Sequence, residues 1–198
     1  MESSKQLRQL VRTQLVPLPR DETFAFFAEP SNLEAITPPW LRFRILSEQP
    51  VVIGEGTLID YRLVVHRVPV RWRTRIERWE PDVCFVDTQV KGPYALWEHT
   101  HAFEEHPDGT LIHDRVEYRM PLGAAGALMH RLVVARDLDR IFDYRRAAIG
   151  RKLGTVPAPA DAAETPRDSS LAPTRRQVSV GKKICQASKL LAVRLRTR

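Results

Sequence analysis

The sequence is poor in cysteine and glycine, with two cysteines and nine glycines among its 198 residues. Cys84 and Cys185 lie in different parts of the chain, so the sequence suggests neither a disulfide framework nor a cysteine-based metal site. The serine, cysteine and glycine residues form no nucleophile elbow, phosphate-binding loop or dinucleotide fingerprint. The common sequence signatures of serine hydrolases and nucleotide-dependent enzymes are therefore missing.

Long apolar runs are also missing. No segment is apolar for long enough to cross a bilayer, and the N-terminal residues MESSKQLRQLVRTQ lack the continuous apolar region of a signal peptide. We therefore expect a cytoplasmic protein. The hydrophobic content of 43% is sufficient for a core, and the length suits one domain of ordinary size with a modest extension.

Acidic residues are scarce toward the C-terminal end, where most of the net charge of +7 is concentrated. Residues 155–198 contain nine Lys or Arg and three Asp or Glu, so residues 1–154 have a net charge of only +1. The Pro/Ala-rich composition of residues 155–174 predicts a disordered linker. Residues 175–198 form a basic tail that we expect to be disordered, with weak contact to an anionic membrane as the alternative. Nucleic acid is the least favoured partner, because no aromatic residue of the tail could stack on bases.

Seven segments have the alternation and the turn boundaries of antiparallel strands. They are residues 8–16, 42–49, 57–66 and 70–80, and three strands between Phe85 and Pro121 that are separated by Gly92-Pro93 and by residues 106–109. Pro69 marks the turn before the fourth strand. Two short helices are expected between the first two strands, at residues 22–28 behind Asp21 as N-cap and at residues 32–36.

After Pro121 the apolar residues recur every three or four positions. Leu128, Leu132, Leu138 and Phe142 share one face of a long amphipathic helix, which the flexible residues 123–126 precede. The apolar side of this helix needs a surface of similar size to bury against. The inward face of the sheet is the candidate.

The last three strands place polar side chains on an otherwise apolar, inward face. These polar residues are Asp87, Gln89, His99, His101, Asp114 and Tyr118. Asp87 and Gln89 point inward only if Phe85 does; otherwise Val86, Thr88 and Val90 form the inward face. The alternate residues of the last strand are expected to be solvated, namely His113, Arg115, Glu117 and Arg119. Buried polar groups are costly unless they are paired, so this cluster is the best functional clue.

The order of one strand, two short helices, six antiparallel strands and one long helix resembles the START-like helix-grip fold of the SRPBCC superfamily. The runs NLEAITPPWLRF, VPVRWRTRI, GPYALWEHTHAFEE and DRVEYRMPLG are similar to a bacterial subgroup described as polyketide cyclase/dehydrase-like or coenzyme-Q-binding. The resemblance covers about residues 5–153. It implies an α+β domain over residues 1–154, in which a seven-stranded antiparallel sheet curves around the C-terminal helix.

The resemblance also implies a cavity for an apolar small molecule, such as a lipid, quinone or polyketide, between the sheet and the long helix. Binding pockets are mostly apolar with a few convergent polar groups, which agrees with this expectation. The candidate ligand-binding residues are Tyr61, Trp72, Phe85, Gln89, Trp97, Phe103, Tyr118, Leu138 and Phe142, with Leu132 as a further lining residue. Plain core packing is the alternative for each apolar member.

Three roles for the polar cluster stay open beside simple ligand binding. His99 or His101 with Asp87 or Asp114 would form a general base for a cyclase or dehydratase, and Tyr118 or Gln89 would donate to the substrate oxygen. The polar groups could instead satisfy one another and bridge the sheet to the helix through Arg136 or Arg145.

Metal binding is the third role. His-x-His holds a metal when a carboxylate completes the set, but two such histidines are more often hydrogen-bonded core residues. We therefore expect no metal and no other cofactor. The sequence favours a non-catalytic binding protein, and it defines neither the ligand nor the oligomeric state.

Overall fold

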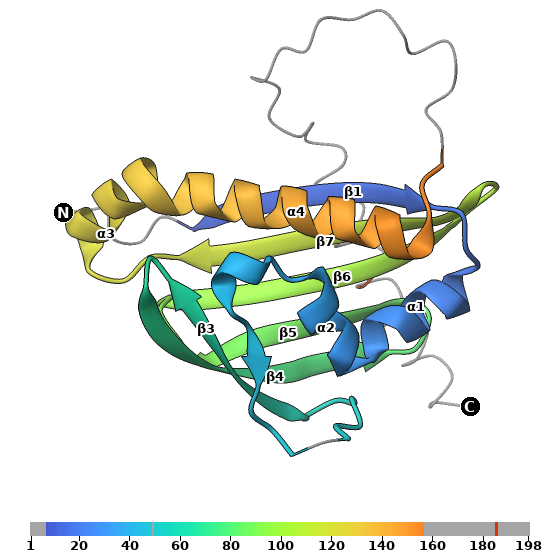
Figure 1. Cartoon of the computed structure of the whole chain (residues 1–198), viewed down its shortest axis with the longest axis horizontal. Helices are drawn as coiled ribbons and strands as arrows, with labels where there is room; N and C mark the ends of the chain where they lie inside the picture. Colours follow the sequence, from blue (N-terminus) through green and yellow to red (C-terminus); the bar gives the residue numbers. More distant parts are fainter. Residues whose placement is uncertain (1–6, 49, 157–184, 186–198) are drawn as a thin grey trace, which may run out of the picture.

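The computed structural model describes residues 7–48, 50–156 and 185, and a seven-stranded antiparallel sheet dominates it (Figure 1). The strand order is β1-β7-β6-β5-β4-β3-β2, so that consecutive hairpins build the sheet and β1 pairs with β7. The strands are β1 (Arg8–Val16), β2 (Arg44–Ile45), β3 (Leu58–Val65), β4 (Val68–Glu80), β5 (Cys84–Lys91), β6 (Leu96–His106) and β7 (Gly109–Arg119).

The β3–β4 hairpin turns at His66 and Arg67, not at Pro69 as predicted. Both turn residues have positive φ, 48° and 69°, which is the conformation that the tightest two-residue hairpins require. Pro69 is the second residue of β4 and lies opposite Val64. Strand β2 is shorter than predicted, because a 3-10 helix (Pro39–Leu41) and a left-handed Arg42 precede it.

Two short helices, α1 (Arg20–Ala28) and α2 (Pro30–Ile36), connect β1 to β2 as predicted. Asp21 lies within the first turn of α1 rather than at its N-cap, which is Pro19. Pro30 opens α2, where its missing N–H leaves no helical hydrogen bond unmade. The Glu29 side chain caps α2 by accepting a hydrogen bond from the Ser31 amide at 3.2 Å.

The C-terminal helix is continuous but not uniform. It consists of α3 (Gly123–Met129), a π-helical segment (His130–Val134) and α4 (Ala135–Leu153), so residues 123–126 are helical rather than flexible. A π turn holds more residues than an α turn, so a single apolar period cannot continue through it. Leu132 is 61% exposed and does not line the interior as predicted, whereas Leu138 and Phe142 of α4 are buried.

Helices α1, α2 and α4 cover one face of the sheet, which confirms the predicted helix-grip architecture (Figure 1). Phe24 and Phe27 of α1 pack on Phe103 of β6. Leu138 and Phe142 belong to a second cluster of buried apolar residues over β6 and β7. These two clusters hold the helices against the sheet and leave the space between them for the site described below.

The opposite face of the sheet is less solvated than predicted. Cys84, Ala102 and His113 are cross-strand neighbours on β5, β6 and β7, and all three are buried. Cys84 forms a disulfide bond with Cys185, with Cα atoms 5.7 Å apart, which the sequence did not suggest. Arg115 is also buried rather than solvated, and its guanidinium pairs with Glu117 of the same strand.

The predictions for the linker (155–174) and the basic tail (175–198) lie outside the described residues, except at positions 155, 156 and 185. Within the described ranges, no helix is long and apolar enough to cross a membrane.

Candidate functional site

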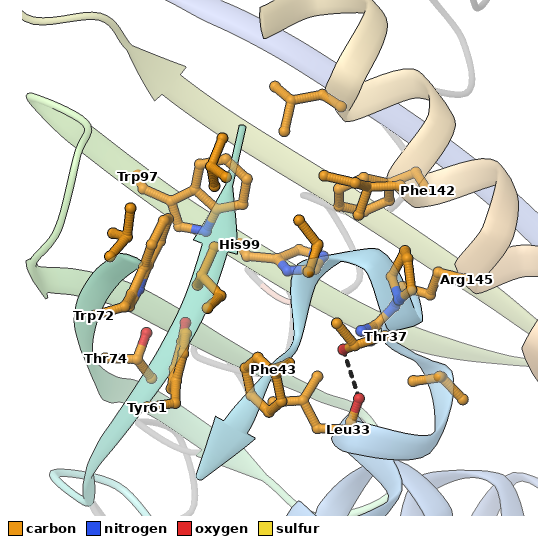
Figure 2. Close-up of a pocket in the computed structure, with 18 of the residues that line it drawn as sticks. Leu33, Thr37, Phe43, Tyr61, Trp72, Thr74, Trp97, His99, Phe142 and Arg145 are labelled. Carbon is orange, nitrogen blue, oxygen red and sulfur yellow. Dashed lines mark hydrogen bonds between the residues drawn. The ribbon is translucent and has the colours of Figure 1, made fainter. Parts of the chain in front are cut away.

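A cavity of about 820 Å³ lies between the covered face of the sheet and helices α2 and α4. Its wall is mainly apolar and comes from strands β3 to β6, from the segment around α2 and from α4. Figure 2 shows Tyr61, Trp72 and Trp97 on the side of the sheet and Phe142 and Arg145 on the side of α4. His99 points from the floor of the cavity between these two sides.

Aromatic side chains form the wall at the β3–β4 end of the cavity. Tyr61 and Trp72 are cross-strand neighbours, and their rings stack with centroids 5.9 Å apart. Trp97 meets Trp72 edge-on at 5.3 Å. Such offset and edge-to-face pairs are favourable, so this part of the wall is a rigid apolar surface.

Six of the nine predicted ligand-binding residues line the cavity: Tyr61, Trp72, Phe85, Trp97, Leu138 and Phe142. The other three have different partners. The Gln89 amide donates to the Tyr94 carbonyl at 2.7 Å and accepts from the Tyr94 N–H at 3.1 Å, which holds the β5–β6 loop. Phe103 is completely buried beneath α1. The Tyr118 hydroxyl lies 2.8 Å from His130 Nε2 under the π-helical segment.

Sequence reasoning missed the part of the wall that comes from the connections. Leu33, Thr37 and Leu41 from the α2 segment and Tyr94 from the β5–β6 loop line the cavity. The run NLEAITPPWLRF carried a signal for this position, since apolar side chains in so short a helical segment must bury against a neighbouring surface. Its location over the sheet depends on tertiary packing.

The polar cluster lies on β5, β6 and β7, and the strand register brings its members together. Asp87 is the cross-strand neighbour of His99, and His101 is the neighbour of Asp114. Asp114 Oδ1 lies 3.1 Å from His99 Nε2 and 2.7 Å from His101 Nδ1. Asp87 Oδ2 lies 3.3 Å from His101 Nε2 and 3.8 Å from His99 Nδ1. Each histidine therefore stands between the same two carboxylates.

The cluster has a layered arrangement relative to the cavity. Asp87, His99 and His101 line the cavity, whereas Asp114 lies behind the two histidines. Arg145 reaches from α4 toward the cluster, with its Nε 3.8 Å from Asp114 Oδ2, and is itself buried. Arg136, the other predicted bridge, is exposed.

Electrostatics shift the pKa values of the two histidines in opposite directions. Burial opposes the charge on Asp114, but His101, His99 and Arg145 outweigh burial and hold the pKa of this carboxyl well below its ordinary value. Burial also lowers the pKa of His101, but Asp114 and Asp87 raise it more, so the net shift is upward. For His99, burial and the neighbouring His101 lower the pKa in spite of Asp114. His101 is therefore the preferred site for a proton, and His99 favours the neutral form.

The family described as polyketide cyclase / dehydrase and lipid transport matches residues 16–143. The chain belongs to this family. The matched range includes the whole polar cluster except Arg145, and it includes the sheet wall of the cavity. No curated protein matches the sequence.

Solved structures share the fold of this polyketide cyclase/dehydrase family member at low sequence identity. A protein from Chromobacterium violaceum has a TM-score of 0.59 and 9% identity, with 75% of this chain and 98% of that chain covered. The Zhui aromatase/cyclase from a Streptomyces species has a TM-score of 0.55 and 16% identity, with coverages of 76% and 100%. A major latex-like protein from Panax ginseng has a TM-score of 0.55 and 9% identity, with coverages of 76% and 99%. The likeness establishes the START-like helix-grip fold predicted from the sequence.

Proposed function

We propose that this polyketide cyclase/dehydrase family member binds an apolar small molecule, of the lipid, quinone or polyketide class, in the cavity. The observation that carries this proposal is a cavity of about 820 Å³ with a mainly apolar wall, in which the polar residues Asp87, His99 and His101 lie together. A volume of this size suits a small or medium organic ligand, and a few convergent polar groups can hold its polar end. The apolar body of the ligand lies against Trp72 and Trp97.

Native mass spectrometry of the purified full-length protein, followed by extraction, is the first test. A co-purified organic species would identify the chemical class of the ligand. Binding is then measured with a short-chain quinone, which quenches the fluorescence of Trp72 and Trp97 when it enters the cavity. We expect saturable quenching at one site.

A matched pair of substitutions tests whether the ligand occupies the cavity. Val70 lines the cavity, and Val70→Trp fills part of it. Val90 is a valine of β5 that is 56% exposed and lies outside the cavity wall, so Val90→Trp is the control. Quinone binding should be weakened by Val70→Trp and unchanged by Val90→Trp. Equal binding by both variants would contradict the location of the ligand in the cavity.

Proton transfer to and from a bound carbonyl compound is the second candidate function. The observation that favours it is the pair of His99 and His101 at the cavity wall, held between two carboxylates, in which the pKa of His99 is lowered and the pKa of His101 is raised. His99 would remove a proton next to the carbonyl group, and His101 would donate to the oxygen. Tyr118 and Gln89, the donors predicted from the sequence, have other partners.

Deuterium exchange separates this second function from simple binding. In deuterated buffer, a cyclic ketone that binds in the cavity should lose its α-protons faster with the wild type than with His99→Gln, as NMR would follow. Binding of the ketone should persist in that variant. Equal exchange rates in both proteins would leave only the binding function.

A further inference from the structure

The two histidines of the cluster turn one ring nitrogen each toward Asp114 and the other toward Asp87. Asp114 Oδ1 contacts His99 Nε2 and His101 Nδ1, at 3.1 Å and 2.7 Å. The contact of His99 Nε2 with Asp114 Oδ1 has the geometry of a hydrogen bond, and such a carboxylate partner favours the tautomer with the hydrogen on Nε2. His99 Nδ1 then directs its lone pair toward Asp87, whereas His101 Nε2 forms a hydrogen bond with Asp87 Oδ2 at 3.3 Å.

Three possible metal-ligand atoms, one each from Asp87, His99 and His101, converge at the cavity wall. Asp87 Oδ2 lies 3.8 Å from His99 Nδ1 and 3.3 Å from His101 Nε2, and all three residues line the cavity. Buried acceptors that face one another without a donor are costly, so a positive charge belongs between them. A proton on His101 provides a donor for the contact between His101 and Asp87. It leaves His99 Nδ1 facing the Asp87 carboxylate without a donor between them.

We infer that Asp87, His99 and His101 bind a divalent transition-metal ion at the wall of the cavity. One ligand atom from each of the three residues lies within 4.8 Å of the others. Bonds of about 2.0–2.2 Å from nitrogen and carboxylate oxygen to Zn²⁺ fit a triad of this size after a small side-chain adjustment. Two imidazoles and one carboxylate suit Zn²⁺ or Fe²⁺ better than Mg²⁺ or Ca²⁺, which prefer oxygen ligands.

The surroundings of the triad match those of a functional metal site rather than a closed structural one. Asp114 contacts both ligand rings on the side away from the metal position and so orients them. A carboxylate is a usual second partner of a metal-bound histidine. Arg145 lies beside Asp114, with its Nε 3.8 Å from Oδ2 of that carboxylate. The triad supplies three protein ligands, so the position that faces the cavity is open to water or to an oxygen of the ligand.

From the sequence we expected no metal, because the His-x-His pattern alone does not show which residue would be the third ligand. The strand register provides that ligand by setting Asp87 opposite His99. Metal binding does not depend on the apolar ligand, so the two proposals fail or succeed separately.

The test uses full-length protein that has been freed of its purification tag and stripped of metal with a chelator. Titration calorimetry with Zn²⁺ alone should show one equivalent bound, and Co²⁺ alone should give a visible absorption band in the same stoichiometry. Asp87→Asn, His99→Gln and His101→Gln should each abolish stoichiometric binding. Asp114→Asn should keep the stoichiometry and weaken the affinity by about 10- to 100-fold, because it loosens both ligand rings.

His113→Gln is the matched control. His113 is another buried histidine with a carboxylate partner, Glu104 at 3.0 Å, but it lies on the opposite face of the sheet. This variant should bind Zn²⁺ like the wild type. If the triad variants do not fold, NMR of the wild-type imidazole nitrogens replaces them: Zn²⁺ should shift the signals of His99 and His101 and leave those of His113 in place.

The absence of stoichiometric binding by wild-type protein would overturn the proposal. So would Zn²⁺ binding that survives in all three triad variants, or imidazole shifts confined to the exposed His66 and His106.

Discussion

Among single residues, Arg145 shows most directly how the buried charges depend on one another. Its side chain is buried, its Nε lies 3.8 Å from Asp114, and its guanidinium lies 5.6 Å above the ring of Phe27. Arg145→Met keeps an apolar stem of similar length but removes a positive charge beside Asp114. Breaking a buried pair costs about 3–5 kcal/mol, so we expect the free energy of unfolding in urea to fall by about 3 kcal/mol.

The neighbouring residue provides the control. Arg146 is exposed, and Arg146→Met should change the free energy of unfolding by less than about 0.5 kcal/mol. Similar losses in the two variants would mean that Arg145 stabilises the helix in some way other than by its charge.

His101 makes the stability of the protein depend on pH in a defined direction. Burial lowers its pKa, but Asp114 and Asp87 raise it more, so the folded-state pKa lies above the ordinary histidine value of 6.5. The folded state therefore binds this proton more tightly than the unfolded state does. The resulting stabilisation is complete below pH 6.5 and disappears as pH rises through the folded-state pKa.

His101→Gln should therefore cost more stability under mildly acidic than under alkaline conditions. Urea unfolding of both proteins, stripped of metal with a chelator, at about pH 6 and about pH 9 measures the difference. We expect the gap between wild type and variant to narrow at the higher pH. A gap that is constant, or that widens with pH, would show that the proton is not shared with Asp114 and Asp87 in the folded state.

At the scale of elements, the connection from β7 to α3 depends on one glycine. A Cβ atom at Gly126 would lie 1.8 Å from the carbonyl oxygen of Pro121, which is backbone and cannot rotate away. Helix propensity alone predicts a gain of about 1 kcal/mol for a glycine-to-alanine change. We expect Gly126→Ala to lower Tm instead, as measured by calorimetry, because the connection must move.

Gly54→Ala is the corresponding control, since a Cβ atom there meets nothing within 4 Å. This variant should leave Tm nearly unchanged. A higher Tm for Gly126→Ala would show that the connection between β7 and α3 adjusts freely.

The elements that the sequence predicted well are those with one buried face. Alternation placed Trp97 and His99 correctly on the inward side of β6, and it did the same for Asp114 on β7. The hairpin turn at His66 and Arg67 could not be predicted in the same way. Neither residue is a glycine or asparagine, so their positive φ values reflect the packing of the hairpin and not a local preference.

The candidate site was predicted only in part, for a related reason. Alternation tells which side of a strand a residue occupies, but not which helix covers that position along the strand. Tyr118 faces inward as predicted, yet the π-helical segment covers it and His130 contacts its hydroxyl. Trp72 and Trp97 face inward farther from this segment and line the cavity. The π-helical segment shifts the register of the C-terminal helix. This shift determines whether an inward-facing residue is covered by the helix or lines the cavity.

At the scale of the whole molecule, the Cys84–Cys185 bond joins the outer face of the sheet to a residue 101 positions later in the chain. No local pattern connects two cysteines so far apart, which is why the sequence did not suggest the pair. In the chain-entropy account, closing a loop of about 100 residues contributes on the order of 4–5 kcal/mol by restricting the unfolded state. The bond therefore contributes substantially to stability, and it joins Cys84, inside the residues matched by the family, to Cys185, outside them.

Three variants that remove this bond should be destabilised to a similar extent. We expect Cys84→Ala, Cys185→Ala and the double variant each to lower the free energy of unfolding by up to about 4 kcal/mol, because all three remove one and the same bond. Reduction of the wild type should reproduce the loss. Losses that add in the double variant would mean that the cysteines contribute independently, and two free thiols in denatured, unreduced protein would contradict the bond itself.

The same thiol titration bears on the expected cytoplasmic location, because the cytosol keeps most thiols reduced while oxidising compartments preserve disulfides. Cells are lysed in an alkylating reagent, and the mass of the chain then reports how many cysteines were free before lysis. A fully alkylated chain would agree with the cytosol and would mean that the bond forms only after extraction. A chain without alkylated cysteines would show that the protein is in an oxidising environment. The Cys84–Cys185 bond would then stabilise the protein in the cell.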